Sequence, residues 1–138
     1  MKFNFDSILI NAHKYVKFLG IYVDNFLNWK EQINAIANKM NSACFAILRM
    51  KELFLANDVI LSIYYSLAYS YLTYGVFLWG NSTETKRIFM SQKRLIGVIC
   101  EPSNFDSCKP YFRKLKLLTV PCIYIYKTLL LIKQYEFT

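Results

Sequence analysis

The feature that most constrains this sequence is a long segment without charge, because no Asp, Glu, Lys or Arg occurs between Asp58 and Glu84. Asn57 and Asp58 suit the start of a helix, since Asn can cap free N–H groups and Asp lies well at the positive end of the helix dipole. The residues that follow are mainly apolar or aromatic. A helix that is apolar on nearly all sides is buried by protein or by lipid. The sequence therefore predicts a buried central helix over 57–80, with Gly80 as its C-cap.

A stripe of small polar side chains runs along this predicted helix at helical spacing. Its members are Ser62, Ser66, Ser70 and Thr73. Small side chains allow the backbone of a second helix to approach closely. We therefore expect a neighbouring helix to pack along the stripe.

The same segment is long enough to span a membrane, which takes about 20 apolar residues. Tyrosines are distributed along its whole length: Tyr64, Tyr65, Tyr69, Tyr71 and Tyr74. In membrane helices tyrosines gather at the two interfaces, whereas a protein core can supply partners for their hydroxyls at any depth. The buried centre of a small helical module is therefore the preferred interpretation. A small basic membrane-associated protein is the alternative.

The chain of 138 residues suits one domain, and its hydrophobic content of 55% argues against disorder. The net charge of +8 lies outside the central segment, because residues 1–56, 83–100 and 101–138 each contribute +3. Such a distribution favours nucleic acid or an anionic surface as the partner.

The cysteines do not indicate a metal site. Cys44, Cys100, Cys108 and Cys122 form no C-x-x-C pair, and the sequence holds a single histidine, His13. The first residues lack the apolar core of a signal peptide. We expect four free and largely buried thiols in an intracellular protein, nuclear or cytoplasmic.

Two β-rich runs, 7–10 and 15–23, predict a β-hairpin at the start of the chain. Gly20 inside the second run predicts a bulge or the close approach of another backbone. The predicted organisation is a hairpin over 1–26 followed by a helical module over 27–138.

The module is predicted to be a helical bundle. A seam at spacings of four and three marks its first long helix: Trp29, Ile33, Ile36, Met40, Ala43, Ile47 and Met50. Asn28 is the expected N-cap of this helix. Further helices are predicted over 57–80, 84–99, 107–115 and 119–135. The expected fold class is mainly α, a bundle of four to five helices with a short N-terminal β-hairpin.

The helix predicted over 84–99 carries a basic cluster. Lys86 and Lys93 are seven residues apart, as are Arg87 and Arg94, so each pair repeats on one face every two turns. Gln92 stands beside them. Lys and Arg serve phosphates and Gln can serve groove or sugar contacts, so the cluster is a candidate nucleic-acid surface. A solvated helix face is the other interpretation.

An ordered set of short motifs covers most of the chain, roughly residues 7–133. The set consists of Lys17-Phe18-Leu19-Gly20-Ile21-Tyr22-Val23-Asp24, Leu27-Asn28-Trp29, Ile33, Tyr64-Tyr65-Ser66-Leu67, Ser70-Tyr71-Leu72-Thr73-Tyr74-Gly75, Trp79-Gly80-Asn81, Gln92-Lys93-Arg94, Leu115 to Thr119 and Ile123-Tyr124. In order and spacing it resembles the region just after the palm of non-LTR retrotransposon reverse transcriptases of the jockey type.

The resemblance implies a function for each part. The hairpin residues Lys17, Phe18, Leu19 and Gly20 resemble the primer grip, and the helices that follow resemble the thumb and its connection, which clasp the template–primer duplex. Two positions depart from the family pattern. Gln32 stands where the family usually has His, and Gly97 stands where an Arg is common, which weakens the basic face of the third helix.

The resemblance does not extend to catalysis. The four aspartates, Asp6, Asp24, Asp58 and Asp106, are far apart, whereas two-metal nucleotidyl transfer needs carboxylates that converge on two cations. We therefore expect no catalytic residue and no cofactor in this chain, with Mg²⁺ belonging to a palm carried elsewhere. The expected partners are an RNA–DNA or DNA duplex and that palm, with no small-molecule substrate. A helical module that binds a protein partner is a further alternative.

Overall fold

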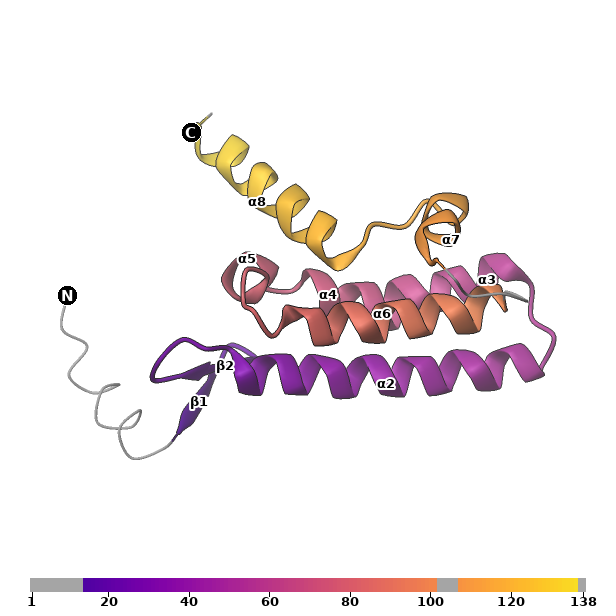
Figure 1. Ribbon diagram of the computed structural model, residues 1–138, viewed down its shortest axis with the longest axis horizontal. Coiled ribbons are helices and arrows are strands. Elements are labelled where there is room, and N and C mark those ends of the chain that lie inside the picture. The colour runs from indigo at the N-terminus through magenta and orange to yellow at the C-terminus, as the bar shows by residue number, and fades with distance from the viewer. Residues whose placement is uncertain (1–13, 102–106, 137–138) are drawn as a thin grey trace.

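The computed structural model describes residues 14–101 and 107–136 of the chain. This part is mainly helical, with one two-stranded hairpin at its start and helices from there on (Figure 1). The observation confirms the predicted fold class. The strand predicted at 7–10 lies outside the described residues.

The hairpin folds within the second of the two β-rich runs. β1 (Tyr15–Phe18) pairs antiparallel with β2 (Ile21–Asp24). Leu19 and Gly20 form the turn between them, with φ values of 47° and 82°. A two-residue turn with positive φ at both positions matches the twist of the strands, and glycine adopts it without steric cost. Gly20 therefore makes the turn of the hairpin and is not a bulge.

The first long helix is α2 (Lys30–Glu52), and the predicted seam is its buried face. Its buried residues are Gln32, Ile33, Ile36, Ala37, Met40, Ala43 and Ile47. The prediction that Asn28 caps this helix is wrong. Trp29 occupies the cap position in a left-handed conformation, and the backbone N–H of Asn28 instead donates to Oδ1 of Asp24 over 2.8 Å.

Lys51 lies near the end of α2 and is largely buried by its contacts with α6 (Thr85–Cys100). Its Nζ donates to the carbonyl oxygens of Val98 and Ile99, over 2.8 and 3.1 Å, and lies 2.8 Å from Oε1 of Glu101. These carbonyls belong to the last turn of α6. A cation there satisfies free carbonyls at the negative end of the helix dipole, so Lys51 joins the two helices.

The central segment is helical, but it is not one regular helix. α3 (Asn57–Ile63) continues into the π-helical turn η1 (Tyr64–Tyr69) and then into α4 (Ser70–Thr73). The chain breaks at Gly75, where φ is 63°, and resumes as the short α5 (Val76–Trp79). The break adds a helix to the predicted number.

The predicted start of the central helix is wrong, because Ala56 occupies the N-cap position and the side chain of Asn57 forms no cap hydrogen bond. At the other end Gly80 is the C-cap of α5, as predicted, but the segment is already interrupted after Thr73, where α4 ends. A Cβ at Gly75 would lie 2.6 Å from Cδ1 of Ile21, so the glycine lets the hairpin pack against this break.

The stripe of small polar residues faces away from the core, contrary to expectation. Ser62, Ser66 and Ser70 are exposed, and their hydroxyls donate to backbone carbonyls of their own helix. The buried face is a row of larger residues: Ile60, Tyr64, Ala68, Leu72, Val76 and Trp79. Serines can satisfy their hydroxyls on the preceding turn, so they need no second helix as a partner.

The last three helices agree with the sequence to within a few residues: α6 (Thr85–Cys100), α7 (Lys109–Lys114) and α8 (Val120–Glu136). Figure 1 shows α6 alongside α2, with α8 crossing near α5 and then leaving the bundle. At the crossing, a Cβ on Gly80 would lie 2.5 Å from the ring of Tyr124. The glycine therefore sets how closely α8 approaches.

Beyond this crossing α8 is apolar but exposed. Only Val120 and Ile123 of this helix are buried. Its exposed large apolar side chains are Ile125, Tyr126, Leu129, Leu130, Ile132 and Tyr135. Among the described residues, no helix combines the length and apolar character that crossing a membrane requires.

Candidate nucleic-acid interface

The two predicted arginines lie along the seam between α6 and α2. Nη1 of Arg87 donates to Oδ1 of Asn34, and Nη1 of Arg94 donates to Oδ1 of Asn41 over 3.5 Å. Both arginines are exposed. Seven residues of helix rise about 10.5 Å, so the two guanidinium groups form a row along the surface. The asparagines hold the arginines in place while leaving their positive charge uncompensated.

The two predicted lysines lie on the other flank of α6. Lys86 is exposed, and Lys93 is half-buried with its Nζ 4.4 Å from the centre of the Phe89 ring. A cation over an aromatic face is attracted to the ring and keeps its charge. The sequence therefore placed the Lys pair and the Arg pair correctly on separate faces.

Gln92 does not belong to this surface, and its prediction as a nucleic-acid contact is wrong. Its side chain is fully buried. Nε2 donates to the hydroxyl of Tyr64 over 3.1 Å and to the carbonyl of Leu118 over 2.9 Å, while Oε1 accepts the N–H of Val120 over 2.9 Å. Gln92 thus connects α6 to η1 and to the start of α8.

None of these surface cations is paired with a carboxylate in the described part of the chain. The two ion pairs found there are Arg49–Glu52, which is exposed, and Lys51–Glu101. Neither involves the cations of α6 or Lys17 of the hairpin. Uncompensated cations raise the local positive potential and attract phosphates.

The hairpin presents its predicted residues at its tip. Lys17 and Gly20 are exposed, and Phe18 and Leu19 are 67% and 74% exposed. Two contacts fix this tip: the hydroxyl of Tyr74 donates to the carbonyl of Leu19, and Oε1 of Gln32 accepts the N–H of Tyr22 over 2.9 Å. Gln32 therefore connects the hairpin to α2.

The hairpin and the start of α6 lie at the same end of the molecule, which brings Lys17 and Arg87 to that end (Figure 1). Sequence reasoning missed the partners Asn34 and Asn41. Their spacing of seven residues matches that of the two arginines, and this shared period was a usable signal.

Two titratable groups near the site have a pKa that burial raises, Tyr64 and Cys44. Burial raises the pKa of Tyr64 to about 12, and burial also raises the pKa of the Cys44 thiol, with Arg94 opposing that shift. The cysteines are free; three are partly buried, but Cys122 is exposed, which corrects the expectation of largely buried thiols. Among residues 14–101 and 107–136, no three His, Cys, Asp or Glu side chains gather as metal ligands.

Comparison of the chain with protein-family models, with curated proteins and with solved structures found no match. The fold and the site therefore define the protein at the level of a class. It is a small, mainly helical module with a hairpin at one end and uncompensated cations on the hairpin and on α6.

Proposed function

We propose that this chain holds duplex nucleic acid by its backbone, as the region that follows the palm of a jockey-type reverse transcriptase. The observation that carries the proposal is the set of surface cations without carboxylate partners in the described residues: Lys17, Lys86, Arg87, Lys93 and Arg94. Contacts to phosphates position a protein on a duplex without reading its sequence.

The arginine row supplies the geometry for such contacts. A guanidinium group presents several donors in a fixed plane and can bind two phosphate oxygens at once. Because Asn34 and Asn41 each accept only part of this donor capacity, Arg87 and Arg94 keep donors for phosphate oxygens. The proposal places one strand along the α2–α6 seam and its end near Phe18 and Leu19.

The chemistry of strand extension would lie outside this chain. Nucleotidyl transfer by the two-metal mechanism needs a palm with paired carboxylates and Mg²⁺. The role proposed for this chain is to hold the template–primer duplex, in the nucleus or cytoplasm, for such a palm.

The test is fluorescence anisotropy of a labelled RNA–DNA duplex over a salt series. Replacing Lys93 and Arg94 by Ala should reduce the log–log salt slope by about two if both contact phosphate. The matched control is Arg113→Ala with Lys133→Ala, which removes the same charge from exposed positions on α7 and α8. Equal slopes for the two double variants would mean that the α6 cations are only a solvated face.

A second candidate function is the binding of a protein partner through α8. The observation that favours it is the row of exposed apolar side chains beyond Ile123, since exposed apolar patches mark interaction sites. On this alternative the chain would bind a duplex no more tightly than a neutral control protein does. Leu129→Lys would abolish self-association or the binding of a protein partner.

A further inference from the structure

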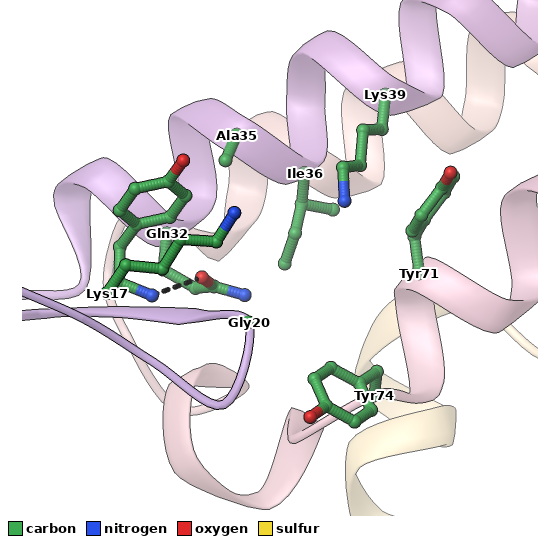
Figure 2. A pocket seen from close by; sticks show the side chains of 9 residues that line it. Lys17, Gly20, Gln32, Ala35, Ile36, Lys39, Tyr71 and Tyr74 are labelled. Atoms are coloured by element: carbon green, nitrogen blue, oxygen red, sulfur yellow. Dashed lines mark hydrogen bonds between the residues drawn. The ribbon is translucent and has the colours of Figure 1, made fainter.

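A small cavity lies between the tip of the hairpin, α2 and α4. It holds about 90 Å³ and is lined by Lys17, Gly20, Tyr22, Gln32, Ala35, Ile36, Lys39, Tyr71 and Tyr74. Figure 2 shows the amines of Lys17 and Lys39 directed into the same space, with Tyr71 and Tyr74 on its other side. Two elements, β1 and α2, therefore each bring one cation to the cavity.

The cations of this cavity have aromatic neighbours and no carboxylate in its lining. Nζ of Lys17 lies 5.3 Å from the centre of the Tyr22 ring, and Nζ of Lys39 lies 4.4 Å from that of Tyr71. Neither lysine forms an ion pair with a described residue. Two positive charges in the lining of one cavity repel, and an anion bound in that cavity would be attracted to both.

Gln32 adds a neutral donor to the same cavity. Because its Oε1 accepts the N–H of Tyr22, the Nε2 amide of this buried side chain remains to donate. The cavity is therefore rich in donors, and each comes from an element of regular structure.

We propose that this cavity binds a single phosphate group between Lys17 and Lys39. One water needs a cavity of at least about 10–15 Å³, so this cavity of about 90 Å³ has room for a group several times larger, such as one phosphate. The bound phosphate group can belong to the backbone of a nucleic-acid strand or can be free inorganic phosphate. Only the first case depends on the proposed function.

The test compares Lys39→Gln, which keeps most of the side-chain length, with Lys30→Gln as the matched control. Both lysines are exposed on α2, and only Lys39 lines the cavity. The first arm measures the melting temperature in inorganic phosphate against chloride at equal ionic strength. The second arm measures the salt slope for a labelled RNA–DNA duplex. Far-UV circular dichroism verifies the helix content of each variant.

If free phosphate binds, it should raise the melting temperature of the wild type and of Lys30→Gln by a few degrees, and Lys39→Gln should lose this rise. If the phosphate comes from a strand, Lys39→Gln should reduce the duplex salt slope by about 0.9 while Lys30→Gln leaves it unchanged.

The two proposals fail in different ways. A phosphate response that depends on Lys39, together with no duplex binding at all, would keep the cavity and overturn the proposed function. Duplex binding that depends on Lys93 and Arg94, with Lys39→Gln equal to Lys30→Gln in both arms, would keep the function and overturn the cavity.

Discussion

Replacing Gln92 by Leu should destabilise the fold more than any surface change on α6. The substitution removes three hydrogen bonds and leaves the N–H of Val120 and the hydroxyl of Tyr64 buried without their partner. Each such group costs about 1–3 kcal/mol, so we expect a loss of about 2–5 kcal/mol after the gain from an apolar side chain. That is a large part of the roughly 5–15 kcal/mol that stabilises a typical domain.

Urea unfolding followed by circular dichroism measures this loss. With an m-value of about 2 kcal/mol per molar urea, the midpoint should fall by about 1–2.5 M. Met90→Leu is the control, because Met90 lies on the same helix and is 60% exposed. Its change should stay within about 0.5 kcal/mol.

A double-mutant cycle tests the physical reason for the loss. Tyr64→Phe alone leaves one N–H of Gln92 without its acceptor, and Gln92→Leu alone leaves the Tyr64 hydroxyl without its donor. The double variant contains neither of these unpaired groups. The double variant should therefore be more stable than the sum of the single losses predicts, by about 0.5–3 kcal/mol. Strict additivity, or a midpoint for Gln92→Leu no lower than that of Met90→Leu, would refute the assigned network.

The remaining predictions concern Tyr64, Lys51 and the cysteines. Burial raises the pKa of Tyr64 to about 12, so the protonated hydroxyl contributes fully to the free energy of unfolding below pH 10. This contribution should be lost between about pH 10 and 12, by up to about 2–3 kcal/mol. In urea titrations Tyr64→Phe should reduce this decrease in stability at high pH. Lys51→Met should cost about 1.5–3 kcal/mol in the same assay, because it removes charged hydrogen bonds to the end of α6. Cys122 should react with a thiol reagent well before Cys44, whose thiol has a raised pKa, and equal rates would contradict the described burial.

The sequence predicts well those features that depend on local periodicity. The seam of α2 repeats every three or four residues, and its residues from Ile33 to Ile47 are buried as expected. The separation of the Lys pair from the Arg pair on α6 followed from the same period. Such features depend only on which residues share a face of one helix.

Features that depend on contacts between distant segments were not predictable in this way. The helix break at Gly75 depends on Ile21 of the hairpin, and the burial of Gln92 depends on Tyr64 and Val120. From the sequence alone Gln92 is predicted to lie on the surface, because it is next to Lys93 and its partners are far away in the sequence. The inward direction of Lys51 was missed for the same reason.

Three residues of the motifs that carry the resemblance, Gly75, Gly80 and Gln92, lie where parts of the fold meet. Gly75 lets the hairpin pack closely, Gly80 lets α8 pack closely, and Gln92 connects three segments by hydrogen bonds. Lys93 and Arg94, by contrast, stand next to Gln92 in the same motif and reach the surface. The motif residues therefore divide into those expected to govern stability and those expected to govern the salt slope. We expect a variant at Gln92 to lose stability. We expect a variant at Lys93 and Arg94 to fold normally and to bind duplex with a smaller log–log salt slope. The two results together would separate the two roles.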